Sequence, residues 1–331
     1  IFWGNSLNKL NRFEEAVEKF EKAAENNPNN IDAYVGSWRD GWADILLKMD
    51  KPKKAEKKYQ EAIEKFPDQK DRIFTQWGDI LAKLGQFEEA VEKFEKVIEF
   101  NPDDRSVYTS LGMALLKQGK TEEAAVKYEE AVEKFPDEKG DIYHNWGDNL
   151  AKLGQFEEAL TQFEKAGQAG LGDWALPSFY SSWGSTLLKL DKPEEAEKKY
   201  KEGIKKVPNS KDQMYRKWGD TLAELNQFEK ALAQFEKAVQ ADPDNSEAYR
   251  SWGNALLKLN RPAEAAKKYQ EAIKKVSPRE ALQVYLAWGN TLVEVGKPEM
   301  ALLKFQEVTK HEPYASPEAY VGIGNALLKQ K

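Results

Sequence analysis

The stretch Trp77–Pro102 reads WGDILAKLGQFEEAVEKFEKVIEFNP and decides the fold. Gly78 and Ala90 are small enough for two helix backbones to cross closely. Gly85 stands between them and tolerates the left-handed conformation that ends a helix. The stretch therefore predicts a helix, a tight turn and a second helix, which we call the A helix and the B helix, closed by Pro102.

The same pattern recurs along the whole chain. Small anchor residues, most of them glycines after a tryptophan, stand at positions 4, 43, 78, 112, 147, 184, 219, 253, 289 and 324. Twelve residues after each of the first nine anchors comes an alanine, and four later an aromatic residue. The aromatic alternates between Phe and Tyr without exception, so the copied unit is a pair of about 70 residues.

A period near 34 residues with these positions resembles the tetratricopeptide repeat family along the whole chain. The resemblance implies an all-α, right-handed superhelical α-solenoid in which residues 1–331 form a single array. It predicts about nine full repeats plus a final A helix, with Trp77, Trp146 and Trp218 buried.

Two segments break the regular spacing. The A helix of the second repeat is predicted to be about five residues longer than the others and to carry Trp38. The fifth repeat lacks its closing proline and has glycines at Gly167, Gly170 and Gly172, which predicts a shortened B helix and a looser joint at 167–176.

The two ends also depart from a complete array. The chain begins at Ile1 partway through a repeat and stops at Lys331 before a B helix, so we expect truncation at the N-terminus and at the C-terminus. Apolar residues at both ends should then stay exposed, which predicts head-to-tail self-association.

Composition narrows the function. A net charge of −6 argues against binding to a phosphate backbone, so no nucleic acid partner is expected. The chain has no cysteine, and its two histidines lie in different repeats, so we predict no catalytic activity, no cofactor and no metal site. No apolar run approaches the length of a membrane span. The compartment stays unknown, with the cytoplasm favoured.

Tryptophan is abundant, and most of it has a structural explanation. Eight of the ten tryptophans occupy one repeat position, which indicates core packing and not a platform for stacking bases or sugars. Only Trp38 and Trp174 stand outside the pattern, as candidates for exposed, functional residues. Lys-Lys pairs on the B helices, such as Lys198 and Lys199, are expected to form a solvated outer surface.

The family resemblance implies where a partner would bind, because the A helices of such arrays line a concave groove. The residue just after each anchor, and those three earlier and four later, should face the ligand. These positions have no packing reason to be polar, yet they are regularly polar here. The candidate partner-binding residues are Asp79, Lys83, Lys117, His144, Asp148, Lys152, Ser185, Lys189, Arg216, Asp220, Arg250, Asn254 and Asn290.

This groove predicts a protein–protein interaction scaffold that holds a protein or peptide of mixed charge. The clamp by which some family members hold a terminal carboxylate is incomplete, because Arg250 and Asn254 are followed by Ala287 and Val321. Two alternatives stay open. The array is the substrate-recruiting arm of an enzyme whose catalytic domain lies outside this sequence, or it is a self-assembling structural array.

Overall fold

The computed structural model of the protein describes residues 1–10, 12–35, 40–311 and 317–330. Within these ranges the chain folds into α-helices and three short 3-10 helices, with no strand. Contacts divide it into two compact units, Ile1–Gly170 and Leu171–Lys331. The prediction of an all-α solenoid of tandem hairpins is confirmed.

Both units consist of hairpins in which A and B helices alternate. The A helices of the first unit are α1 (Phe2–Lys9), α3 (Ile31–Tyr34) with α4 (Trp42–Lys48), α6 (Lys70–Lys83), α8 (Arg105–Lys117) and α10 (Lys139–Lys152). Its B helices are α2 (Phe13–Asn26), α5 (Pro52–Lys65), α7 (Phe87–Phe100), α9 (Thr121–Lys134) and α11 (Phe156–Ala169).

The second unit repeats this order. Its A helices are α12 (Leu176–Lys189), α14 (Lys211–Glu224), α16 (Ser246–Lys258), α18 (Pro278–Glu294) and α20 (Pro317–Leu328). Its B helices are α13 (Pro193–Lys206), α15 (Phe228–Ala241), α17 (Pro262–Lys274) and α19 (Pro298–His311). The 3-10 helices η1 (Pro67–Gln69), η2 (Pro136–Glu138) and η3 (Pro208–Ser210) follow α5, α9 and α13.

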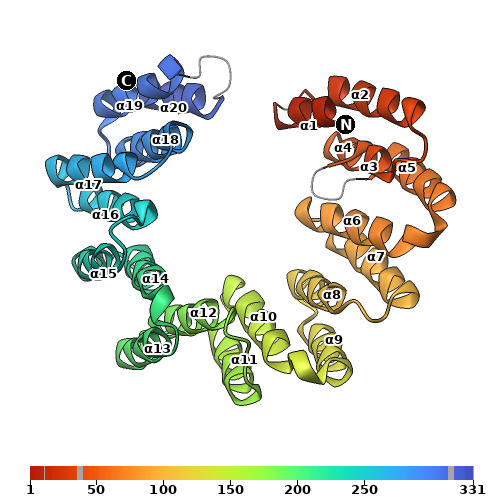
Figure 1. Ribbon diagram of the computed structural model, residues 1–331, viewed down its shortest axis with the longest axis horizontal. Helices are drawn as coiled ribbons and strands as arrows, with labels where there is room; N and C mark the ends of the chain where they lie inside the picture. Colours follow the sequence, from red (N-terminus) through yellow and green to blue (C-terminus); the bar gives the residue numbers. More distant parts are fainter. Residues whose placement is uncertain (11, 36–39, 312–316, 331) are drawn as a thin grey trace. The chain divides into compact units, whose positions relative to one another are not determined.

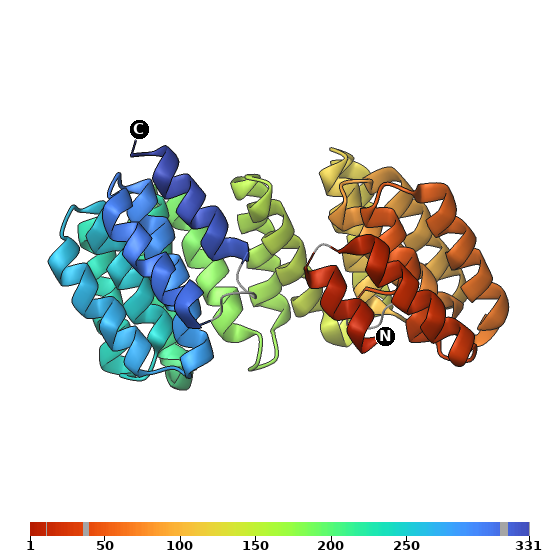
Figure 2. The same cartoon turned by 90° about the horizontal axis from the view of Figure 1, so that it is seen from above.

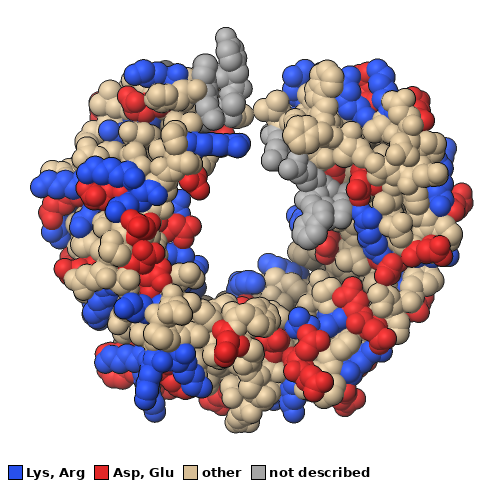
Figure 3. All heavy atoms as spheres, viewed as in Figure 1, with Lys and Arg blue, Asp and Glu red and all other residues tan. Residues whose placement is uncertain are grey.

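The row of hairpins in each unit is curved, with the A helices on the concave side and the B helices outside (Figure 1). Turned by 90°, the helices of each unit lie side by side as tilted rods (Figure 2). Neighbouring A helices contact one another, and most B helices also contact the next A helix. Acidic and basic side chains are interspersed over the outer faces (Figure 3).

The turns inside the hairpins follow the sequence prediction. Eight described residues seven positions after an anchor have a left-handed backbone: Asp50, Gly85, Gly119, Gly154, Asp191, Asn226, Asn260 and Gly296. The ninth, Asn11, lies outside the described residues. The prolines Pro52, Pro193, Pro262 and Pro298 begin B helices, as predicted.

The anchor glycines allow the two helices of a hairpin to touch. A Cβ atom added at Gly78 would come within 2.6 Å of Cε1 of Phe94 on the B helix of the same hairpin. In the repeats that carry tyrosine, the ring contacts its own anchor and also stacks on the tryptophan of the next A helix. Tyr59 stacks on Trp77 with ring centroids 4.4 Å apart, and Tyr200 stacks on Trp218 at 4.7 Å. These contacts join successive repeats within each unit.

Most of the predicted tryptophan core is confirmed. Trp42, Trp77, Trp146, Trp218 and Trp288 are buried, while Trp183 and Trp252 are half-buried. Trp3 departs from the prediction, because 66% of its surface is exposed. Outside the pattern, Trp174 is 75% exposed, and Trp38 lies outside the described residues.

The prediction for the Lys-Lys pairs is correct for the first lysine, as Lys198 is exposed, but the second lysine lies over a tryptophan ring. The ammonium of Lys199 lies 3.5 Å from the ring centroid of Trp183, and that of Lys268 lies 3.3 Å from Trp252. Burial lowers the pKa of Lys268, with nearby glutamates opposing the shift. These lysines cover the half-buried indoles through their stems and by cation–π contact.

The two irregular repeats differ from what the spacing predicts. In the second repeat the A helix is not one long helix: α3 ends at Tyr34, and α4 begins after Gly41, whose extended backbone N–H donates to Asp44 at 2.6 Å. In the fifth repeat α11 keeps 14 residues, so the predicted shortening is wrong. It runs to Ala169 and is ended by Gly170, whose φ is +84°.

Candidate functional site

A hollow of about 630 Å³ opens on the concave side of the first unit. Three successive A helices supply most of its wall, namely α6, α8 and α10. Its lining residues are Asp79, Ala82, Lys83, Gly85, Phe87, Phe94, Thr109, Ser110, Met113, Ala114, Lys117, Asn145 and Asn149. The structure thus brings Asp79, Lys83 and Lys117 together in one place.

The charged residues of this hollow differ in how far they are buried. Asp79 is half-buried, and burial raises the pKa of its carboxyl, although the charge of Lys83 opposes the shift. Lys83 and Lys117 end their helices and are exposed. Met113 and Phe87 also line the hollow and contribute apolar atoms. The hollow therefore offers an acceptor, two cations and apolar surface.

On α10 the predicted residues behave differently from one another. His144 is buried, with Nε2 at 3.4 Å from Oδ2 of Asp148, and it is not among the lining residues. Burial lowers the pKa of His144, while the charges of Asp148 and Asp141 oppose the shift. Lys152, at the end of the helix, is exposed. The structure therefore places His144 in the hairpin packing, not in the hollow.

Two predicted residues in the second unit have an internal reason to be polar. The hydroxyl of Ser185 lies 2.8 Å from the buried hydroxyl of Tyr200 and 2.8 Å from that of Thr221. In the same way, Asn254 Oδ1 accepts hydrogen bonds from the hydroxyl of Tyr269 and, at 3.1 Å, from that of Thr291.

This bonding corrects the premise that these positions lack a packing reason for polarity. In the repeats with tyrosine, the residue after the anchor satisfies a buried hydroxyl, whose loss of partners would be costly. Asp44 plays this part for Tyr59, at 2.5 Å. In the fourth repeat the residue after the anchor is Met113, which has no hydroxyl, amide or carboxyl group. The hydroxyl of Tyr128 instead accepts a hydrogen bond from Asn149 Nδ2 on the next A helix, at 2.9 Å.

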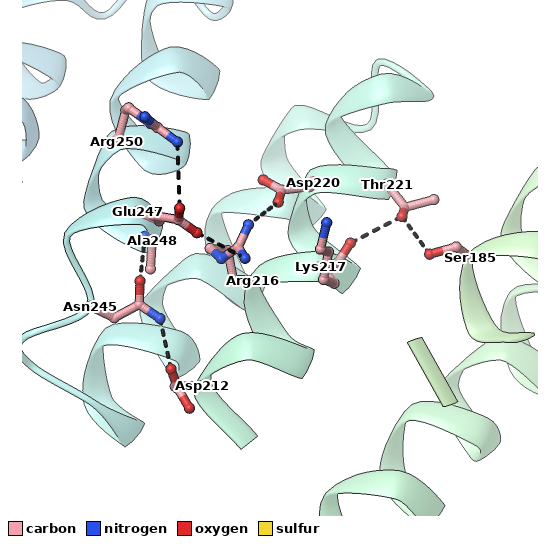
Figure 4. Close-up of polar contacts among 10 residues, drawn as sticks. All are labelled: Ser185, Asp212, Arg216, Lys217, Asp220, Thr221, Asn245, Glu247, Ala248 and Arg250. Carbon is pink, nitrogen blue, oxygen red and sulfur yellow. Dashed lines mark hydrogen bonds and ion pairs between the residues drawn. The ribbon is translucent and has the colours of Figure 1, made fainter. Parts of the chain in front are cut away.

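A network of ion pairs joins α14 and α16 (Figure 4). Arg216 Nη1 lies 3.0 Å from Asp220 on its own helix, and Nη2 lies 3.0 Å from Glu247 on the next. Arg250 is 4.0 Å from the same Glu247. Burial raises the pKa of Asp220, while a hydrogen bond from Ser251 and the charges of Arg216 and Lys217 lower it. Three of the predicted residues, Arg216, Asp220 and Arg250, are therefore engaged in ion pairs within the array.

The remaining predicted residues of the second unit lie apart from that network. Lys189 is paired with Glu224 on the next A helix, with 3.3 Å between Nζ and Oε2. Asn290 is exposed on α18. The predicted positions in this unit are thus distributed along successive A helices.

Sequence reasoning missed several polar residues of the hollow. Thr109, Ser110, Asn145 and Asn149 line it but were not among the candidates. They sit within one helical turn of the positions that were chosen, so a full listing of the polar A-helix residues near each anchor would have found them.

The described residues contain no group of three or more His, Asp or Glu side chains placed to hold a metal ion. None of the described helices has the length and apolar character needed to cross a membrane.

Sequence models of one family match several parts of the chain. Models described as "Tetratricopeptide repeat" match residues 4–30, 108–138, 139–166 and 216–280, and one described as "TPR repeat" matches 78–119. No curated protein matches the sequence significantly.

Solved structures of similar architecture have low sequence identity to the chain. A tetratricopeptide repeat protein from Parabacteroides merdae is 16% identical, covers 78% of this chain and 99% of its own, and has a TM-score of 0.45. YrrB, described as a TPR protein with an unusual peptide-binding site, is 24% identical, with coverages of 58% and 97% and a TM-score of 0.34. The P58(IPK) TPR domain is 15% identical, with coverages of 99% and 96% and a TM-score of 0.28.

The family matches agree with the hairpins, the left-handed turn residues and the close contact of anchor glycine with aromatic ring. The chain belongs to the tetratricopeptide repeat family.

Proposed function

We propose that this protein is an interaction scaffold that holds a segment of another protein in the hollow lined by α6, α8 and α10. The observation that carries the proposal is the hollow itself, which has a volume of about 630 Å³. Most of its lining comes from A helices, which lie on the concave side of the first unit (Figure 1). Ligand sites commonly have volumes of about 300–1,000 Å³.

The chemistry of the wall suits an extended polypeptide. Such a chain has backbone donors and acceptors that need partners, and side chains that need pockets. Asp79, Ser110 and Asn145 offer polar partners, while Met113 and Phe87 offer apolar surface. Polar and apolar groups are intermixed along one wall, which is what a backbone with alternating side chains requires.

The test fills the hollow without changing its charge. Ser110→Phe places a bulky ring in the lining, and Thr161→Phe places the same ring on the exposed face of the outer helix α11. Each variant is used to capture partners, which are identified by cross-linking and peptide mapping. We expect Ser110→Phe to lose a partner segment that the wild type and Thr161→Phe retain. Equal retention by both variants, with both folded by circular dichroism, would contradict the proposal.

We also propose self-association as a second function, because apolar side chains are exposed on the first and last described helices. Trp3 on α1 is 66% exposed, and Val321 and Leu328 on α20 are 63% and 70% exposed. Contact between copies would remove this surface from water. Sedimentation over a range of concentrations should show larger species for the wild type than for a Val321→Glu, Leu328→Glu variant. A wild type that stays monomeric throughout would rule this out.

A further inference from the structure

Several A helices end in lysine, and three of these lysines have an ion-pair partner. On α4, Lys48 Nζ lies 2.5 Å from Asp40. On α16, Lys258 lies 2.8 Å from Glu294 of the next A helix, as Lys189 on α12 does with Glu224. A glutamate at the same register of the neighbouring helix thus neutralises these lysines in the second unit.

Three successive lysines in the first unit differ from this pattern. Lys83, Lys117 and Lys152 end α6, α8 and α10, are exposed, and form no ion pair with any residue that the structure describes. We call these three the lysine row. Two of them, Lys83 and Lys117, line the hollow.

Carboxylates one helical turn before the lysines do not offset the positive charge equally along the lysine row. Asp79 and Asp148 stand one turn before Lys83 and Lys152 on the same helices, and both are half-buried. The equivalent residue on α8 is Met113, so Lys117 has no carboxylate at that position. The middle of the lysine row is therefore its most positive point.

The spacing of the lysine row restricts the ligand. Packed neighbouring helices lie about 8–10 Å apart. A polyproline II chain repeats its side-chain direction every three residues, with a rise of about 3.1 Å per residue, or roughly 9 Å per turn. In a β-strand, by contrast, side chains three residues apart point to opposite faces. Of these two extended geometries, polyproline II is the one that presents one side chain of the same kind to each lysine.

We propose that the lysine row binds a partner segment in polyproline II conformation that carries a carboxylate side chain at every third residue. The inference rests on the proposed function and specifies its ligand. The backbone of such a segment has no internal hydrogen bonds. Ser110 and Asn145 in the adjacent lining supply partners for it. The paired lysines of the second unit do not bind the same segment.

The probe is a synthetic peptide of four Asp-Pro-Ala triplets, compared with a peptide of the same composition in which the four aspartates are consecutive. Proline at the following position favours the extended conformation at each aspartate. Fluorescence anisotropy with the full chain measures both affinities. We expect the triplet peptide to bind more tightly, and its affinity to fall as salt is added.

Charge reversal assigns the site. Lys117→Glu should weaken binding of the triplet peptide by about fivefold or more, since it replaces an attraction by a repulsion. Lys117→Arg should retain binding. The matched control is Lys258→Glu, which reverses a paired lysine at the same register of α16 and should leave the affinity unchanged.

Equal binding of the two peptides would overturn the inference, as would equal losses in Lys117→Glu and Lys258→Glu. If Ser110→Phe abolishes capture of the natural partner while Lys117→Glu leaves that capture intact, the hollow is still the binding site, but the proposal of an acidic ligand is wrong. If neither variant affects capture, both proposals fail.

Discussion

Removing the hydroxyl of Tyr59 tests how the tyrosine repeats are held together. The ring is fully buried and stacks on Trp77 at 4.4 Å, and its hydroxyl donates to Asp44 Oδ1 at 2.5 Å. Asp44 is also fully buried, and its other oxygen accepts the N–H of Gly41 at 2.6 Å. Tyr59→Phe keeps the ring and its stacking but takes one donor from a buried carboxylate.

The expected cost follows from the charge of the acceptor. A hydrogen bond to a charged group contributes about 1.5–3 kcal/mol, so we expect Tyr59→Phe to destabilise its repeat by about 2–3 kcal/mol. Tyr200→Phe deletes the same atom beside a neutral partner, Ser185, which keeps its contact with Thr221 at 2.8 Å. There the expected cost is about 1 kcal/mol.

Hydrogen exchange is the suitable assay, because repeat arrays open locally and a single unfolding midpoint averages over the repeats. Amides of α4 and α5 should exchange about 30- to 140-fold faster in Tyr59→Phe, and those of α12 and α13 about fivefold faster in Tyr200→Phe. Equal acceleration at the two sites would refute the reasoning, since the larger cost at Tyr59 is attributed to the charge of its partner.

Three further changes test the packing, the turns and the buried histidine. Gly147→Ala should destabilise by about 1–3 kcal/mol in chemical denaturation, because its Cβ would lie 2.7 Å from Phe163, whereas Gly324→Ala, with no atom within 4 Å, should be neutral or stabilising. Asp191→Gly should stabilise by up to about 1 kcal/mol, because φ is +56° there; destabilisation would argue against that backbone. Burial lowers the pKa of His144, so the unfolded chain takes up the proton first and stability falls as the pH drops through about 6.5. His144→Gln should reduce the difference between denaturation midpoints at pH 7.5 and pH 5; an unchanged difference would show that other groups cause it.

The sequence predicts the hairpins well because their requirements are local. A left-handed residue must follow each A helix, and only glycine, asparagine or aspartate meets that requirement cheaply, as at Gly85 and Asn226. A small anchor must face a ring sixteen residues later, as Gly78 faces Phe94. Both rules depend on spacing along the chain, so they can be read from one sequence.

Features that depend on how side chains pack in three dimensions could not be read in this way. Spacing did not indicate that the ammonium of Lys199, on the following B helix, would lie over the ring of Trp183. Spacing also did not indicate that Asp44 would accept the backbone N–H of Gly41 at the start of α4. The hollow likewise depends on how α6, α8 and α10 pack, so spacing alone could not distinguish Asn145 from the other polar residues near the anchors.

The alternation of Phe and Tyr, which is plain in the sequence, also determines which groove positions can serve a ligand. A buried tyrosine hydroxyl engages the polar residue after the anchor, as Tyr200 engages Ser185. A phenylalanine makes no such demand, so Asp79 and Asp148, whose hairpins contain Phe94 and Phe163, need not bond to their own B helix. Acceptors at this level of the groove therefore recur at every second A helix, about 16–20 Å apart, and not at each one. Between them, α8 presents Met113, where an apolar side chain of the partner can pack.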